Sequence, residues 1–140
     1  MRIEVAGIPA PQGSKRHVGG GRMVEQSRAV GPWREAVRAE TQRAVKNYRG
    51  QEPFTGPVEV RIAFRLPKPK STPKHICWPA KRPDLDKLVR SVLDGLTAGG
   101  ALVDDSQVVL LGASKRFAGQ RDTRPVGAWI EIVEMGDEKA

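Results

Sequence analysis

The chain has 140 residues, with 24 Lys and Arg against 16 Asp and Glu, so its formal net charge is +8. This length fits one domain with a modest core, and the charge favours a polyanionic partner such as a nucleic acid. The single cysteine excludes an intrachain disulfide and indicates a reducing compartment. We expect no membrane segment, because no apolar run is long enough to span a bilayer and no apolar signal segment opens the chain.

The first part of the chain combines a predicted strand with a basic segment. Residues 1–8 alternate loosely between apolar and polar side chains and predict a strand that ends before Pro9. Residues 12–25 follow as a flexible basic loop or hairpin, which is either solvated or contacts DNA phosphates. The cations that would make those contacts are Lys15, Arg16 and Arg22.

The segment 31–48 predicts a helix with Pro32 in its first turn. One stripe of this helix is apolar or aromatic, and we expect it to pack in the core: Trp33, Val37, Ala44 and Tyr48. The other side carries three arginines that are either a DNA-facing strip or simply solvated: Arg34, Arg38 and Arg49.

Residues 58–66 are the clearest strand, because apolar side chains occupy every second position. The segment 67–83 then holds five of the 11 prolines and no acidic residue, a composition that cannot form a packed core. It is either a plain linker or a mobile basic arm that delivers DNA to the acids behind it. Within it, Trp78 either wedges against bases or pins the loop to the body. Its candidate DNA-binding residues are Lys68, Lys70, Lys74, Lys81 and Arg82.

Residues 85–96 predict a second helix, because leucines and valines recur there at the helical period. Pro83 precedes this helix and Asp84 can cap its first turn. Gly99 and Gly100 should end it, since glycine readily takes the left-handed geometry of a helix C-terminus. The face opposite the apolar stripe carries Asp86, Arg90 and Asp94.

Five of the 16 acidic residues of this basic chain fall within a short stretch: Asp84, Asp86, Asp94, Asp104 and Asp105. Asp94 lies about 12 Å along the helix from Asp86, too far for the two to share one ion. The segment after the glycine turn can extend about 20 Å, enough to return to the start of the helix. Asp84, Asp86 and one of Asp104 or Asp105 can therefore converge, within one subunit or between two.

Such a group of carboxylates predicts a divalent metal site. Hard oxygen ligands favour magnesium or manganese over zinc. The structural alternative is that these acids only cap the helix, form a turn and pair with Arg90 on a solvated face. Their clustering in a basic chain favours the metal site.

Two further strands are predicted at 108–117 and 126–133, and the tail at 136–140 should fray. The order of elements is strand, helix, strand, helix, strand, strand. This order predicts an α+β fold. We expect a small single domain over residues 1–135, with a mixed or antiparallel sheet and two main helices.

The segment R-P-D-L-D-K-L-V-R-S-V-L-D-G-L, followed by V-D-D-S-Q-V, resembles the signature of the RusA family of Holliday-junction resolvases, common in phages and prophages. P-Q-G-S-K-R and P-W-R, nearer the N-terminus, are similar to its phage branch. The resemblance implies a magnesium-dependent homodimer that resolves four-way DNA junctions by paired symmetric nicks in recombination and repair, in the cytoplasm of a bacterial host. It places the three essential acids at Asp84, Asp86 and Asp105.

Two positions depart from the family pattern. Lys87 stands where the family often has asparagine, and Arg90 stands where it has a functional lysine. Arginine keeps the positive charge and can fork onto a phosphate, but it does not release its proton near neutral pH. A charge-stabilising role therefore survives the change at Arg90, whereas a proton-transfer role does not. Lys87 offers a titratable amine instead, about 60° away around the helix.

We therefore predict a structure-selective endonuclease whose Mg²⁺, or Mn²⁺, is held by Asp84, Asp86 and one of Asp104 or Asp105. Arg90 or Lys87 would bear on the transition-state phosphate. One alternative is a non-catalytic basic nucleic-acid-binding protein with structural acids. A more distant one is a glycosyltransferase whose D-x-D motif holds a nucleotide sugar.

Overall fold

The computed structural model describes residues 1–12, 16–18, 22–24, 29–120 and 122–136, with the backbone alone for the two short strands near the N-terminus. Its elements in chain order are β1 (Arg2–Ala6), β2 (Arg16–Val18), β3 (Arg22–Val24), α1 (Val30–Arg49), β4 (Val58–Leu66), α2 (Leu85–Ala98), the 3-10 turn η2 (Asp105–Gln107), β5 (Val108–Phe117) and β6 (Gly127–Glu134). The predicted tail 136–140 lies outside the described residues except for Gly136. Among the described residues, no helix combines the length and apolar character that a membrane span requires.

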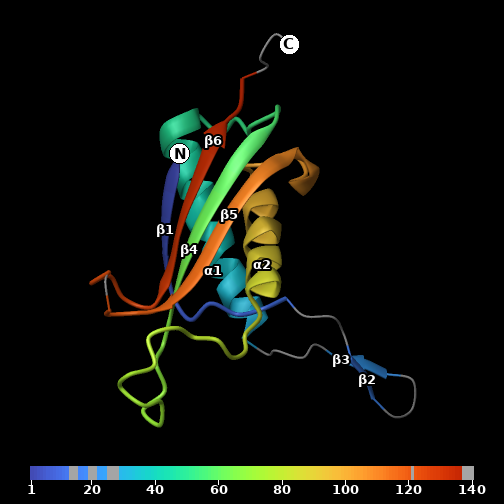
Figure 1. Cartoon of the computed structure of the whole chain (residues 1–140). Coiled ribbons are helices and arrows are strands. Elements are labelled where there is room, and N and C mark those ends of the chain that lie inside the picture. Colours follow the sequence, from blue (N-terminus) through green and yellow to red (C-terminus); the bar gives the residue numbers. More distant parts are fainter. Residues whose placement is uncertain (13–15, 19–21, 25–28, 121, 137–140) are drawn as a thin grey trace.

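Four strands form a mixed sheet in the order β1-β6-β4-β5, and β2 pairs with β3 in a separate hairpin. β4 and β5 run parallel, while β6 is antiparallel to both β1 and β4. Both helices cover the same face of the sheet (Figure 1). The predicted α+β class, with a mixed sheet and two main helices, is confirmed.

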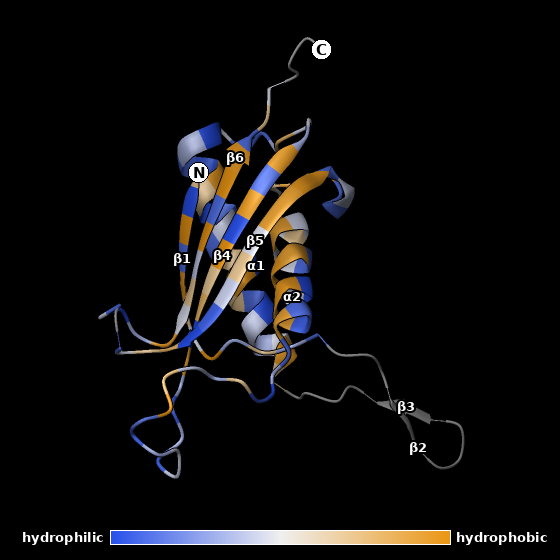
Figure 2. Cartoon of the chain, viewed as in Figure 1, coloured by the Kyte–Doolittle hydropathy of each residue, from blue (hydrophilic) through white to orange (hydrophobic). Residues whose placement is uncertain are grey.

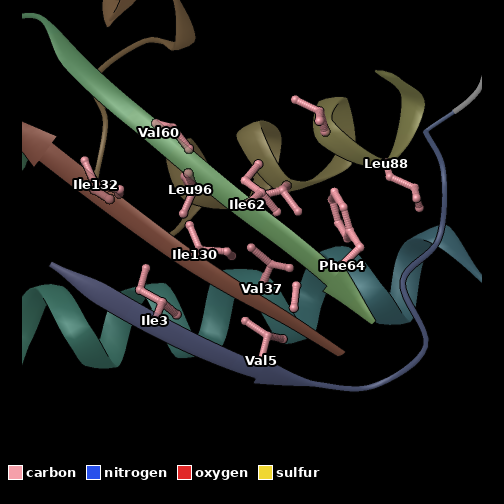
Figure 3. Close-up of a cluster of buried hydrophobic side chains, with 14 of the residues drawn as sticks. Ile3, Val5, Val37, Val60, Ile62, Phe64, Leu88, Leu96, Ile130 and Ile132 are labelled. Atoms are coloured by element: carbon pink, nitrogen blue, oxygen red, sulfur yellow. The ribbon is translucent and has the colours of Figure 1, made fainter. Parts of the chain in front are cut away.

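The core fills the space between this sheet face and the helices. β4 contributes every second side chain to it, because alternate residues of a strand point to the same face. Figure 3 shows these side chains meeting those of β1, β6 and both helices. The labelled members, all buried, are Ile3, Val5, Val37, Val60, Ile62, Phe64, Leu88, Leu96, Ile130 and Ile132.

The two helices approach each other closely through a glycine within α2 and another at its C-cap. A Cβ built on Gly95 would lie 2.5 Å from a methyl carbon of Val37, and one built on Gly99 would lie 2.6 Å from Cβ of Thr41. Real Cβ atoms do not come so close, so a larger residue at either position would push α1 and α2 apart. α2 is thereby held in one position against the core, which fixes the direction in which its charged face points.

Two details of the helices differ from the sequence-based expectation. Gly100 has the left-handed backbone predicted for a helix end, with φ of 86°, but Gly99 keeps helical geometry with φ of −81°. Gly99 is therefore required for close packing rather than for a turn. Tyr48 was expected in the core stripe of α1 but is 75 % exposed, because Val45, almost one turn earlier, takes the buried position instead.

The open face of the sheet carries charges that largely neutralise one another. Arg61 lies 3.3 Å from Glu59 and 3.8 Å from Glu131, which also accepts a hydrogen bond from Arg2. Exposed pairs of this kind add little stability. These ion pairs nevertheless engage Arg2 and Arg61, so this face of the sheet offers less unpaired positive charge than the loops do.

The turn between β5 and β6 is tied to β1 by a second group of charges. Arg124 donates hydrogen bonds to Asp122 and Glu4, and Glu4 also accepts one from the buried Arg65. The hydrogen bonds from the Arg124 side chain lower the pKa of the Asp122 carboxyl to about 2.

That low pKa makes stability depend on pH. An unfolded Asp titrates near about 3.9, so the pair stabilises the folded state above about pH 4 and loses this contribution as the pH falls towards 2. We expect Asp122→Asn to be less stable than the wild type at about pH 5, with the difference disappearing near pH 2. Urea unfolding followed by tryptophan fluorescence measures this, and an undiminished difference at the lower pH would contradict it.

Candidate active site

At the start of α2, the Asp84 carboxylate has no hydrogen-bond or ion-pair partner among the described residues, and the Asp86 carboxylate has only a distant one. Asp84 occupies the N-cap position with an extended backbone, but its side chain makes no capping hydrogen bond. Asp86 lies in the first turn, exposed, with its nearest cation 4.0 Å away on Lys87. The N-terminus of a helix is electropositive and favours negative charge. Because the Asp84 carboxylate does not accept a capping hydrogen bond, both acids remain able to bind a cation.

A lysine from β5 holds the chain that leads into this motif. The Lys115 ammonium donates hydrogen bonds of 2.8 Å to the carbonyl oxygens of Lys81 and Pro83, directly before Asp84. Sequence reasoning missed this residue. The available signal was its position, because Lys115 falls on the same face of its strand as the apolar Ala113. A cation at such a position is expected to have a structural partner.

The N-terminal segment braces the other side of α2. The backbone N–H of Gln12 donates to the carbonyl of Lys87, and the buried hydroxyl of Ser91 donates to the carbonyl of Ala10. These bonds fix the first two turns of α2 against the body of the protein. The positions of Asp84 and Asp86 are thus set by two separate parts of the chain.

Asp104 and Asp105 have different surroundings, although they are neighbours. Asp104 caps η2 by accepting a hydrogen bond from the backbone N–H of Ser106, and Gln107 completes a capping box with it. Hydrogen bonds from the side chain and backbone of Ser106 lower the pKa of the Asp104 carboxyl. The exposed Asp105 side chain makes no hydrogen bond or ion pair with any described residue. The geometry therefore favours Asp105 as a ligand and gives Asp104 the task of holding the turn.

The two pairs of acids lie near opposite ends of α2, because Asp84 and Asp86 stand at its start, whereas Asp104 and Asp105 belong to the turn η2 that follows its end. Asp105 precedes β5, whereas Lys115, which contacts the Asp84 motif, stands seven residues into that strand. Seven strand residues cover about 23 Å. No group of three potential metal ligands occurs within the described part of a single chain. Of the two arrangements expected from the sequence, convergence within one subunit is not found, and convergence between two remains.

The path of the chain after α2 explains this separation. Leu102 forms a bridge with Phe54, and the side-chain amide of Gln107 donates to the carbonyls of Phe54 and Gly56. The segment is therefore tied to the start of β4 and does not run back along α2. β5 then begins at the same level as β4, as the parallel pairing requires.

A family model described as Endodeoxyribonuclease RusA matches residues 5–124. The chain belongs to the RusA endodeoxyribonuclease family. The match spans both halves of the acidic motif and confirms the resemblance seen in the sequence. No curated protein gives a significant match. Membership in the RusA family supports nuclease activity.

The basic residues expected to contact DNA in this RusA family member lie mostly at the Asp84 end. Most of those in the loop 67–83 are exposed and have no acidic partner within the described part of the chain: Lys70, Lys74, Lys81 and Arg82. Lys68 differs, because it is half-buried with its ammonium 5.4 Å from the centre of the Phe117 ring. Lys15 lies outside the described residues, and Arg16 and Arg22 lie in the β2–β3 hairpin, whose side chains are not described.

Arg90 is exposed on α2 and forms no ion pair with Asp86 or Asp94 among the described contacts. Asp94 instead faces Arg34 of α1 at 3.9 Å. The structural alternative, in which Arg90 forms ion pairs with Asp86 and Asp94 on the same helix, is therefore not found. Arg90 remains available to a phosphate beside the acids.

The arginines on the outer side of α1 are used within the protein. Arg38 forms hydrogen bonds with Glu35 and Gln42, and Arg34 with Gln12. Arg49 lies over the ring of Phe54 at 3.7 Å. The arginines Arg34, Arg38 and Arg49 of α1 are thus engaged within the subunit, whereas Arg90 of α2 and the exposed cations of the loop 67–83 have no acidic partner among the described residues.

Proposed function

We propose that the protein is a magnesium-dependent endonuclease that resolves four-way DNA junctions as a homodimer. Each of its two active sites takes Asp84 and Asp86 from one subunit and Asp105 from the other. The observation that carries this proposal is the placement of three exposed carboxylates, none of which caps a helix, near opposite ends of α2 in one subunit. A nuclease built from this chain then needs a second copy to complete its metal site.

The edge of the sheet supports such a pairing. β5 is an edge strand, and its first part exposes three consecutive apolar side chains, Val109, Leu110 and Leu111, each at least half exposed. Figure 2 shows this stretch as hydrophobic along the outer side of the sheet, beside α2. An exposed apolar edge strand favours association with another chain.

A two-fold axis across β5 would bring the acids together. The operation reverses the strand, so the end that carries Asp105 in one copy lies beside the end that carries Asp84 and Asp86 in the other. The dimer would have two such sites related by the same axis. Paired nicks on opposite strands of a symmetric junction require this arrangement.

The donor set fits a hard divalent cation, because it consists of carboxylate oxygens that no described cap or close ion pair occupies. When bound, magnesium would supply Lewis-acid chemistry and lower the pKa of a water molecule. Asp84, Asp86 and Asp105 would hold it. Asp104 and Gln107 would keep the turn that presents Asp105, and Lys115 would keep the approach to Asp84.

The cations of α2 would act on the phosphate. Arg90 has no ion-pair partner in the described structure, so its guanidinium can offset the charge that develops on the phosphate in the transition state. Lys87 lies beside Asp86 and adds a second positive charge. The exposed lysines of the loop 67–83 would grip the DNA backbone without regard to sequence, so binding should weaken as salt rises.

Cleavage of a synthetic four-way junction beside a linear duplex of the same sequence tests the proposal. With magnesium we expect paired nicks in opposite strands of the junction and at least about tenfold less cutting of the duplex. With excess chelator, cutting should stop, and manganese should restore it. Cleavage that persists in chelator would contradict the metal site. Junction binding without cutting in either metal would favour the non-catalytic alternative.

A further inference from the structure

The loop between β4 and α2 folds over an apolar hollow of about 630 Å³. This volume lies in the range of pockets that bind small organic molecules. Prolines make up much of the wall, and other apolar side chains, some exposed and some buried, complete it. The lining includes Pro67, Pro73, Ile76, Trp78, Pro83 and Phe117.

The loop is held in place over this hollow. Backbone hydrogen bonds close local turns from Thr72 to Pro69 and from Ile76 to Pro73. Lys115 binds its last residues to β5. Prolines restrict the backbone further, since each ring fixes φ. These contacts give the segment a defined path over the hollow.

The exposed side chains of the hollow suit a flat apolar ligand that carries negative charge. Ile8 is 63 % exposed and Trp78 is 55 % exposed, although both are large and apolar. The guanidinium of Arg116 lies 4.4 Å from the centre of the Trp78 ring. Lys81 and Arg82 also line the hollow. An apolar floor with cations at its edge matches a nucleobase attached to a phosphate backbone.

The position of the hollow links it to the cut. Arg82 and Pro83 line it, and Asp84 is the next residue along the chain. We infer that the hollow receives one unstacked nucleobase next to the scissile phosphate and that Trp78 stacks on it. This inference rests on the proposed function. It adds that strand choice depends on how easily a base leaves the stack, which is easiest at the open centre of a junction.

The test is a double-mutant cycle that combines a change in the protein with a change in the DNA. Binding is measured with the Asp105→Asn protein, which should not cut, on junctions in which each nucleotide flanking the cut is replaced in turn by an abasic site. On the intact junction we expect Trp78→Ala to weaken binding by on the order of tenfold, and Trp78→Phe to recover most of it. On the junction that lacks the inserted base, Trp78→Ala should have no effect, because its partner is gone. Tyr48→Ala, which removes an aromatic residue that is also exposed but far from the loop, should change nothing.

Equal effects of Trp78→Ala on every abasic junction, or no effect on the intact one, would overturn the inference. A change in oligomeric state of Trp78→Ala without DNA would also overturn it, because the hollow would then hold a second copy of the chain. Wild-type cleavage is scored separately. If the wild type cuts the junction but the effect of Trp78→Ala does not depend on the missing base, the nuclease proposal stands and the base pocket is refuted. If the effect depends on the missing base but the wild type does not cut, the base pocket stands and the nuclease proposal is refuted.

Discussion

Asp84→Asn and Asp105→Asn should each abolish junction cleavage alone, and mixing the two proteins should restore nicking. Each change removes one negative ligand from every active site, so we expect a loss of at least about a thousandfold in either pure variant. In a mixed dimer one site collects both changes and the other collects none. Random exchange of subunits makes half of the dimers mixed, so about a quarter of all sites become intact. Because each mixed dimer has one working site, the product should be nicked junction rather than resolved duplex.

The measurement is single-turnover cleavage of a labelled junction after the two variants have been mixed and allowed to exchange subunits. Asp94→Asn is the matched control. Asp94 lies on the same helix but faces Arg34, so this variant should retain activity. If the acids converged within one subunit, every mixed dimer would have two defective sites and the mixture would stay inactive. An inactive mixture with proven subunit exchange would therefore exclude the shared site.

Gly99→Ala, at the C-cap of α2, should destabilise the protein strongly. Its new methyl group would lie 2.7 Å from the backbone oxygen of Arg38 and 2.6 Å from Cβ of Thr41, neither of which can rotate away. We expect a loss of about 2 to 3 kcal/mol in the free energy of unfolding. Gly95→Ala meets Val37 at 2.5 Å and should cost about 1 to 3 kcal/mol, depending on how far that side chain can shift.

Urea unfolding with comparison of midpoints and slopes measures both effects. Gly31→Ala is the control, since a Cβ at that position in α1 meets nothing within 4 Å. It should be neutral or stabilising by up to about 1 kcal/mol, because alanine favours a helix more than glycine does. Wild-type stability of Gly99→Ala would mean that α1 and α2 do not pack as closely as described.

The regular elements could be predicted from the sequence because their patterns are local. Strict alternation gave the 58–66 strand its observed limits, and the leucine and valine spacing located α2. Tyr48 was misplaced because a helical stripe says which side faces the core but not how far along the helix the core extends.

The active site was harder to predict because it depends on distant parts of the chain. The acids could be identified, but their separation follows from the bridge between Leu102 and Phe54, a contact with no local signal. By contrast, the sequence does contain a local signal that distinguishes Asp104 from Asp105. Asp104 and Gln107 stand at capping-box spacing, which marks Asp104 as the cap of a turn. Lys115 acquires its role only when β5 lies beside the loop that ends at Pro83.

The exposed edge strand β5 has a consequence for how activity depends on protein concentration. If dimerisation completes the active site, a monomer is inactive. Nuclease activity then rises roughly with the square of the protein concentration while monomers predominate. Nuclease activity would then be very low at low copy number and would rise steeply as copies accumulate. Such a threshold would come from the architecture itself, without a separate inhibitor.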